Sequence, residues 1–429
     1  METGVEGGVA GGVPEGAKGG LVGGVLGGVL GGGTMELRYL AKSSIVFVLF
    51  CILMLFHCGP KQDKVERTIE NGVEVVINHL KPYQIRGEPF NLSLEKEFTI
   101  DLEKDEIANI GLTDSLAGVD VDSVGNIFLF QYPSGGRNIV FKFDRNGKFV
   151  TSFGLRGQGP GEVNFAWHIR VSNQDKIVIT GPADRKLFFY SNDGEFEKYI
   201  TFSSAVQEAL PLDNGNFLIK GYEVTVPESK HIEWPLCLFN SKLEKIKELD
   251  KYFRLDEFKA DTIEFPEPVL INSISNRKIY TGYGKRGYEI WVFDLDGNLM
   301  RKIRKEFQPV GIPEGVKEET RKATEDPRYV IYGKKIRFSK HWPPFQYLFT
   351  DDEGRLFVMT YEEGENPSEY MYDVFNSDGV FIDRMSLGNL VFESYWNIQY
   401  VTARKNRLYC LRRKDSGYRE LVVYKMIWE

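Results

Sequence analysis

Short apolar runs that follow polar turns recur along most of the chain. Each run starts with a polar residue and comes after a turn rich in Asp, Asn and Gly, residue types that tolerate positive φ or bond their own backbone. The six copies are residues 126–129, 176–179, 216–219, 278–281, 355–358 and 407–410. Apolar and β-branched runs between turn signals predict β-strands.

A second signal lies further along each copy, where an alternating strand enters a tight turn. Four of these turns carry an Asx-Gly pair, at residues 143–147, 190–194, 293–297 and 375–379. Asx-Gly between alternating apolar strands is a strong signal for a β-hairpin. The copy at residues 239–242 lacks the glycine, and the copy at 424–428 reaches the C-terminus without a turn. Each repeat therefore predicts two hairpins, which make four strands.

Four-stranded units repeated in this way are typical of propeller blades. The predicted fold is all-β: a six-bladed β-propeller with four-stranded antiparallel blades over residues 95–429. The last copy lacks a fourth strand, whereas an unpaired alternating strand at residues 96–102 precedes the first copy. We expect this N-terminal strand to complete the sixth blade and close the ring, which removes the exposed sheet edges. Residues 59–94 are expected to be a linker with a small hairpin, turning at Asn71-Gly72, beside the ring.

These repeats resemble the six-bladed β-propeller family with NHL-like repeats that is found among exported bacterial proteins. The glycine-rich stretch at residues 153–162 is similar to that family's connection after the first blade. The resemblance covers most of residues 95–429 and implies the fold. It leaves the function open, because propellers of this kind include scaffolds, binders, lyases and lactonases.

The N-terminal region predicts export. The glycine-rich tract of residues 1–34 has no side chains large enough for a core, so we expect disorder there, or a start codon assigned upstream of Met35. Residues 35–58 have a basic start and a short apolar run, typical of a signal peptide or membrane anchor. Cys58 at its end resembles the lipidation site of a bacterial lipoprotein, although Phe56 and His57 are bulkier than such signals prefer. We expect a periplasmic or cell-surface protein, tethered by a lipid at Cys58 or by the uncleaved segment.

Composition excludes several functions. The formal net charge of −7 offers no basic face for nucleic acid. Two of the four cysteines lie in the export segment, and Cys237 and Cys410 are far apart, so a disulfide framework is excluded. No nucleophile elbow, metalloprotease helix or phosphate loop occurs. The sequence thus favours a monomeric binding module over an enzyme, with no required cofactor.

Connection lengths predict a binding face. The turns between the first and second and between the third and fourth strands of each blade are short and share one face. The opposite face carries the long connections, at residues 131–138, 154–165, 222–234, 250–272, 304–346 and 362–369. Long loops gathered on one face of a rigid scaffold are typical of a binding surface. The largest insertion, residues 313–344, predicts a helix at 314–324 and a lid over the channel, or a small aromatic core of its own.

The candidate ligand-binding residues lie at the predicted starts of the innermost strands, which line the channel, and in the insertion. They are Trp167, His168, Arg170, Tyr347, Trp396, His341 and Trp342. We expect them to bind a protein, a peptide or a glycan. The alternative is a metal-dependent hydrolase, lactonase or lyase with zinc or calcium at the channel mouth. However, His168 is the single histidine at the equivalent channel positions, so a metal site has no defined ligand set.

Overall fold

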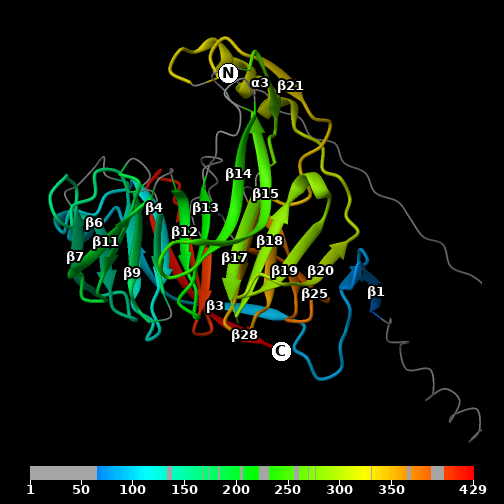
Figure 1. The fold of residues 1–429 in the computed structure, drawn as a ribbon, viewed down its shortest axis with the longest axis horizontal. Helices are drawn as coiled ribbons and strands as arrows, with labels where there is room; N and C mark the ends of the chain where they lie inside the picture. Colours follow the sequence, from blue (N-terminus) through cyan, green and yellow to red (C-terminus); the bar gives the residue numbers. More distant parts are fainter. Residues whose placement is uncertain are drawn as a thin grey trace, which may run out of the picture. The chain divides into compact units, whose positions relative to one another are not determined.

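Six blades of four antiparallel strands form the fold in the computed structural model, and a further hairpin extends one of these blades to a six-stranded sheet (Figure 1). The structure describes residues 65–132, 138–166, 168–172, 174–181, 184–202, 206–221, 231–255, 260–268, 270–275, 277–329, 331–364, 369–387 and 401–429, with backbone alone for His231 and Leu255. The described residues all belong to one compact unit, Gln62–Glu429. The predicted six-bladed β-propeller is confirmed.

Strands follow the chain order within each blade. Blade I contains β4 (Leu116–Val121), β5 (Ile127–Gln131), β6 (Asn138–Phe143) and β7 (Phe149–Leu155). Blade II contains β8 (His168–Val171), β9 (Ile177–Gly181), β10 (Lys186–Tyr190) and β11 (Phe196–Thr201). Blade III contains β12 (Val206–Pro211), β13 (Phe217–Gly221), β14 (His231–Phe239) and β15 (Lys245–Leu255).

Blades IV and V repeat this order, whereas in blade VI a strand from before blade I takes the fourth place. Blade IV contains β17 (Leu270–Ser275), β18 (Lys278–Tyr283), β19 (Glu289–Asp294) and β20 (Leu299–Lys305), with the short 3-10 helix η1 (Gly284–Arg286) between β18 and β19. Blade V contains β22 (Tyr347–Thr350), β23 (Leu356–Glu363), β24 (Tyr370–Phe375) and β25 (Phe381–Leu387). Blade VI contains β26 (Val401–Arg404), β27 (Arg407–Arg413), β28 (Arg419–Trp428) and β3 (Leu92–Asp101), after which comes the short helix α2 (Asp105–Asn109).

The ring closes through β3, as the sequence predicts. This strand pairs antiparallel with β28, in a register that runs from Leu92↔Trp428 to Asp101↔Glu420. The first and last strands of the ring therefore share one sheet. The strand begins four residues before the predicted start at residue 96, because the long β28 provides pairing partners up to Trp428.

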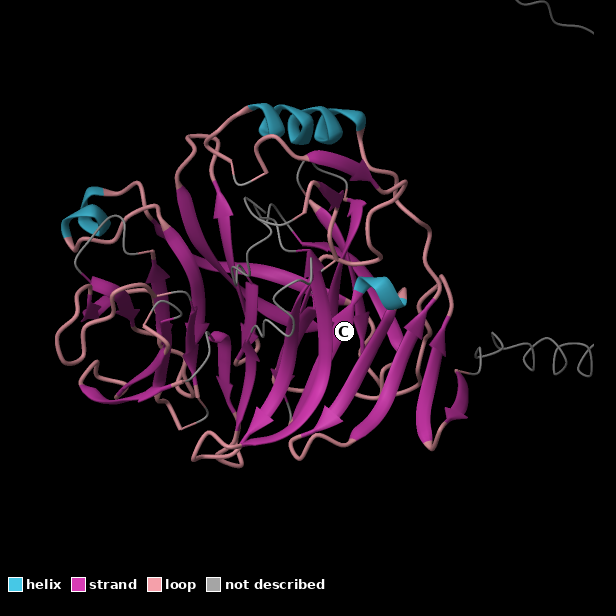
Figure 2. Cartoon of the chain, turned by 45° about the horizontal axis from the view of Figure 1, so that its top comes forward, coloured by secondary structure: helices cyan, strands magenta, loops and turns pink. Residues whose placement is uncertain are grey.

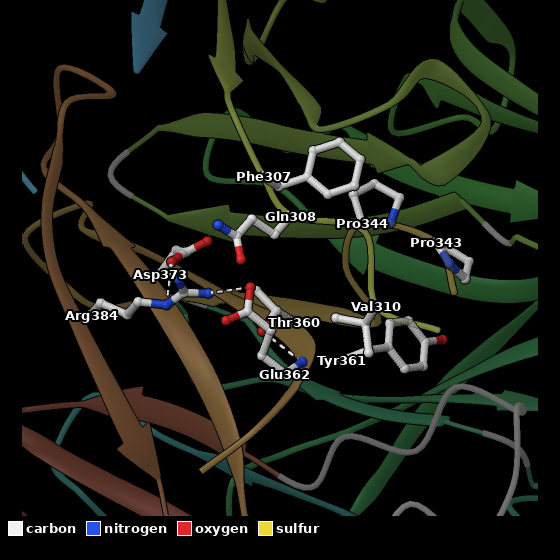
Figure 3. A pocket seen from close by; sticks show the side chains of 10 residues that line it. All are labelled: Phe307, Gln308, Val310, Pro343, Pro344, Thr360, Tyr361, Glu362, Asp373 and Arg384. Atoms are coloured by element: carbon white, nitrogen blue, oxygen red, sulfur yellow. Dashed lines mark hydrogen bonds and ion pairs between the residues drawn. The ribbon is translucent and has the colours of Figure 1, made fainter. Parts of the chain in front are cut away.

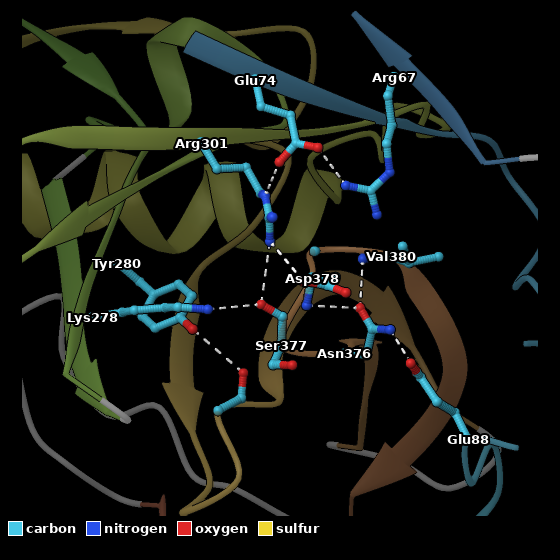
Figure 4. A network of polar contacts seen from close by, with 12 residues as sticks. Arg67, Glu74, Glu88, Lys278, Tyr280, Arg301, Asn376, Ser377, Asp378 and Val380 are labelled. Carbon is cyan, nitrogen blue, oxygen red and sulfur yellow. Dashed lines mark hydrogen bonds and ion pairs between the residues drawn. The ribbon is translucent and has the colours of Figure 1, made fainter.

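The hairpin of β1 (Glu66–Glu70) and β2 (Val73–Asn78) extends blade IV to six strands, since β2 pairs in parallel with β20. Figure 4 shows the polar contacts around this junction. Arg301 of β20 donates to Glu74 of β2 at 2.6 Å and reaches Asp378 in the turn between β24 and β25 at 3.4 Å. Asn78 donates to the carbonyl oxygens of Arg304 and Gly379, 3.1 and 3.0 Å away. The hairpin is thus bonded to blade IV and to blade V.

The insertion after β20 forms an accessory layer, visible at the top of Figures 1 and 2. Helix α3 (Glu314–Glu325) confirms the helix predicted at 314–324; it ends before Pro327, which disfavours helical geometry at the preceding residue. Strand β21 (Lys335–Phe338) pairs in parallel with β16 (Thr262–Phe265) from the connection between blades III and IV. The Phe338 ring packs edge-on against Phe265 and lies under the Arg321 guanidinium. These contacts form a small, partly buried aromatic cluster between the insertion and the connection before blade IV; the role of the insertion as a lid over the channel stays a prediction.

Apolar side chains pack between neighbouring blades and form the core. One cluster of buried residues joins blades I and II, and others join II with III, III with IV and IV with V. The largest cluster runs through blades V, VI and I, across the closure. Burial of these side chains is the main favourable contribution to the ring's stability.

The glycines of the Asx-Gly turns approach the preceding blade closely. Gly147, Gly194, Gly297 and Gly379 all have φ between 77 and 87°. A Cβ atom on each would lie 2.5–2.7 Å from a side chain on the outer strand of the blade before it. In blade III, Leu243 takes this position with φ of 61° and packs its side chain into the core between blades II and III. The turn glycines therefore serve blade packing as well as hairpin geometry.

We expect Gly194→Ala to reduce the free energy of unfolding by about 2 to 4 kcal/mol, because left-handed strain adds to overpacking. The new Cβ atom would lie 2.5 Å from the Phe153 ring and 3.0 Å from the Phe153 Cβ, so rotation of the ring cannot relieve the contact. Gly215→Ala is the matched control, with φ of 82° and no atom within 4 Å. Urea denaturation that gave equal losses for the two variants would contradict the packing role.

Candidate functional site

The short turns of the propeller are occupied in joining blade to blade. Basic side chains of one blade donate to backbone carbonyl groups in the turn between the third and fourth strands of the next blade. Such donors are Lys142 to Asn192, Lys247 to Gly297, Lys278 to Ser377 and Arg407 to Arg145, at 2.7–3.0 Å. Four turns of this face are therefore bonded to a neighbouring blade. The long-loop face remains the better place to search for a ligand site.

The innermost strands bring three of the predicted residues together with an acid that the sequence analysis did not select. Arg170 on β8 donates to Glu208 on β12 at 2.5 Å, and Lys220 on β13 lies 3.2 Å from the same carboxylate. Asn272 on β17 donates to Glu208 at 3.4 Å. Burial raises the pKa of Glu208, but the opposing effect of Lys220 and Arg170 is larger and lowers this pKa well below its usual range. Glu208 is therefore an ionised carboxylate between two cations.

Tyr347 and His168 belong to the same group of channel residues. The Tyr347 hydroxyl donates to the carbonyl oxygen of Val401 at 3.4 Å, and burial raises its pKa. His168 is 3% exposed, and its Nε2 has no hydrogen-bond partner among the described residues. Burial lowers the pKa of His168 to about 3, although the nearby Glu208 acts in the opposite direction. The imidazole is therefore neutral near pH 7 and offers no positive charge to an anion.

Because the His168 imidazole is buried in its neutral form, we expect the free energy of unfolding to decrease in acid. The pKa of His168 is about 3 in the folded protein, against an ordinary value of 6.5, so the unfolded chain binds one more proton between these values. Stability must fall as the pH falls through this window, by about 2 kcal/mol between pH 6.5 and 5 from this group alone. His168→Gln should remove that share of the slope. Free energies of unfolding measured at both pH values test this, and parallel curves for the two proteins would contradict it.

A pocket on the long-loop face lies between blades IV and V, beside the base of the insertion (Figure 3). The space between its lining atoms is about 250 Å³ with open solvent included, and the enclosed part has room for about one water molecule. Three separate segments line it: the residues that follow β20, the last residues of the insertion, and strands β23, β24 and β25 of blade V. The lining residues are Phe307, Gln308, Val310, Pro343, Pro344, Thr360, Tyr361, Glu362, Asp373 and Arg384.

Two predicted residues lie at the base of the insertion, next to this pocket. Trp342 donates its backbone N–H to Val310 at 2.9 Å, and His341 forms a β-bridge with Gly311. The Trp342 ring stacks on Tyr361, with centroids 4.5 Å apart and planes 5° from parallel. His341 and Trp342 thus position the insertion against blade V, and their contact with a ligand stays a prediction. Trp167, Trp396 and Cys58 lie outside the described residues.

Neither a metal site nor a membrane helix is found in the described part of the chain. No three His, Cys, Asp or Glu side chains gather there in a way that could hold a metal ion. No helix in the same residues is long and apolar enough to cross a bilayer. Both cysteines in these residues, Cys237 and Cys410, are buried, and they form no disulfide with each other, as the sequence predicts.

Sequence reasoning missed Glu208, although a signal for it exists. His168 and Tyr347 stand eight residues before the strand starts at Lys176 and Arg355, and Glu208 stands eight residues before Asn216. The same eight-residue spacing, applied to the third blade, therefore identifies Glu208. The pocket residues of blade V carry no comparable signal, because an Asp and an Arg within alternating strands are also typical of a solvated face.

Comparisons with known proteins agree with this fold. Residues 119–305 match the profile of a family described as a 6-bladed beta-propeller. No curated protein matches the sequence. An exported protein from Bacteroides fragilis has a similar structure, with a TM-score of 0.50 and 12% sequence identity, over 82% of this chain and 99% of that one.

Another similar structure is a member of the DUF4221 family from Bacteroides vulgatus, with a TM-score of 0.50 and 12% identity, over 80% of this chain and 99% of that one. At this identity the likeness concerns the fold alone. The NHL-like character of the repeats stays a resemblance.

Proposed function

We propose that this protein is an exported β-propeller that binds its ligand on the long-loop face, at the pocket between blades IV and V. The supporting observation is the contrast between the two faces. The short turns are bonded from blade to blade, whereas the long-loop face contains a pocket with both apolar and charged walls. Such a combination is typical of ligand sites. The signal-like segment at residues 35–58 supports export.

Paired steric variants test the face. A screen of the purified protein against immobilised oligosaccharides and peptides first identifies a binder. Gln308 is exposed at the pocket, so Gln308→Trp adds bulk there without disturbing the core. Asp296→Trp adds the same bulk on an exposed short turn. We expect the first variant to weaken binding at least about tenfold, since a blocked contact of about 1.4 kcal/mol has this effect, and the second to leave binding unchanged. The reverse result would place the site on the short-turn face.

A further inference from the structure

Strands β16 and β21 form a two-stranded sheet outside the blades, beside helix α3 (Figure 1). They pair in parallel, from Thr262↔Lys335 to Phe265↔Phe338, and the described residues provide no third strand. Sheets of this size have little stability of their own, and parallel sheets in particular are normally covered by other elements. An open strand edge also offers its backbone groups to any further strand. This sheet is therefore incomplete in a way that the blades are not.

The outer edge of β21 has backbone groups that point away from β16. Lys335 donates its N–H group to the carbonyl oxygen of Asp261, next to β16, at 2.9 Å. Because alternate residues of a strand direct their backbone groups to the same side, Ile336 and Phe338 direct theirs to the other side. No backbone group of another described segment bonds these two residues. The outer edge thus has donors and acceptors for one more strand.

Helix α3 packs against one face of β21 and leaves the other face to solvent. The Phe338 ring lies under the Arg321 guanidinium of the helix, so Ile336 and Phe338 share the face that the helix covers. Lys335 and Arg337 alternate with them and are exposed. A strand added at the outer edge would therefore place every second side chain beside these two cations.

The exposed charge along this edge is positive. Residues 334–340 contain four Lys and Arg side chains and no Asp or Glu, within a chain of net charge −7. Arg337 lies 3.5 Å from Glu264 on β16, whereas the exposed Lys335 and Lys340 have no ion pair within the described residues. A second copy of β21 would bring like charges together across the new pairing, which is destabilising. An acidic strand would bring opposite charges together.

From the open edge, the covered face and the positive charge, we propose that β21 binds an extended acidic peptide of a partner protein as a third strand. The peptide backbone bonds Ile336 and Phe338, and the acidic side chains lie beside Lys335 and Arg337. In strand addition to a sheet edge, backbone hydrogen bonds contribute affinity and alternate side chains contribute specificity. This surface is separate from the pocket between blades IV and V and does not depend on the function proposed for that pocket.

The test measures the fluorescence anisotropy of a labelled octapeptide of alternating glutamate and valine with the full-length protein. Ile336→Pro removes the outward N–H group, and because an edge strand tolerates proline on its open side, the pairing with β16 remains. Binding should weaken about tenfold. Ile336→Ala keeps this donor and is the matched control. Lys335→Glu should weaken binding about fivefold, whereas Lys148→Glu, the same change at an exposed residue of blade I, should leave it unchanged. Melting temperatures verify that each variant folds.

Each outcome decides the proposal. Binding that is weakened in Ile336→Pro and Lys335→Glu, but not in Ile336→Ala and Lys148→Glu, supports it. Equal binding of the octapeptide with every backbone nitrogen methylated overturns it, because strand pairing needs these donors. Equal binding of an octapeptide of alternating lysine and valine, or no binding of the acidic octapeptide, overturns it as well.

Two further results identify another occupant or another site. A dimer of the unaltered protein that Ile336→Pro dissociates in analytical ultracentrifugation makes a second copy the occupant and overturns the proposal. Octapeptide binding that is blocked by Gln308→Trp and unchanged in Ile336→Pro supports the pocket as the ligand site and overturns strand addition. Binding that is lost in Ile336→Pro and unchanged in Gln308→Trp supports strand addition independently of the pocket.

Discussion

A chain that starts at Lys104 should lose cooperative unfolding, whereas a chain that starts at Gly87 should retain it at a lower stability, because this chain too lacks the buried Val75, Val76 and Tyr83. The longer chain keeps β3, which completes blade VI against β28, and the shorter chain lacks it. Loss of β3 removes the buried Leu92 and Ile100, and it exposes apolar residues of β28 such as Val423. Each buried side chain of this size contributes about 1.5 to 3 kcal/mol. Because total stability is about 5 to 15 kcal/mol, the loss is comparable to the whole.

The pair of truncations separates closure from the rest of the N-terminal region. Both lack the β1–β2 hairpin, so the difference between them reports on β3 and the few residues on either side of it. A synthetic peptide of residues 88–103, added in trans to the shorter chain, should restore a single urea transition by completing the sheet. Circular dichroism and tryptophan fluorescence should then give coincident curves. If the shorter chain unfolds cooperatively at the same urea concentration as the longer one, closure by β3 does not hold the ring together.

The repeat was predictable because every blade uses the same local physics. Period-two strands and Asx-Gly turns are short-range signals, and six copies reinforce one another. Closure followed from counting strands, since the last copy lacked its fourth. Leu243 shows the limit of such signals: in blade III a residue other than glycine takes the positive φ, and the turn forms because tertiary packing supports it.

The two parallel strand pairings and the pocket could not be predicted from the sequence. The pairing of β2 with β20 joins residues 227 positions apart, and the pairing of β16 with β21 joins two separate connections. Neither leaves a local signal, because a parallel partner can come from any distant strand. The pocket depends on three segments that meet only after the insertion folds back at Gly311 and His341. The channel residues were predictable in part. Their spacing of eight residues before the predicted second strand of a blade identifies His168 and Tyr347, and it identifies Glu208 when it is applied to every blade.

Replacing Glu208 by Gln should reduce the free energy of unfolding by about 3 to 5 kcal/mol, because it leaves a buried cation without its counter-charge. Lys220, with a side chain that is 3% exposed, lies 3.2 Å from the carboxylate and keeps a carbonyl oxygen of Leu270 and the amide oxygen of Asn272 as its other partners, at 3.4 and 3.3 Å. Neutral oxygens compensate a buried ammonium group less well than a carboxylate does. Urea denaturation at pH 7 measures the loss.

The controls distinguish a buried charge from a general loss of polar contacts. Glu353→Gln removes a carboxylate that pairs with Arg355 but is 59% exposed, and it should cost less than about 1 kcal/mol. The double variant Glu208→Gln with Lys220→Met removes the buried pair and leaves Arg170, which is more exposed than Lys220, so it should recover part of the stability lost in the single variant. The lowered pKa of Glu208 also predicts how its contribution to the free energy of unfolding changes with pH. Its pKa is lower in the folded protein than in the unfolded chain, so its contribution is complete above the unfolded value and decreases as the pH falls below it. The Glu208→Gln penalty should therefore shrink in acid, and a penalty that stayed constant from pH 7 to pH 3 would show that the side chain acts through shape and not through charge.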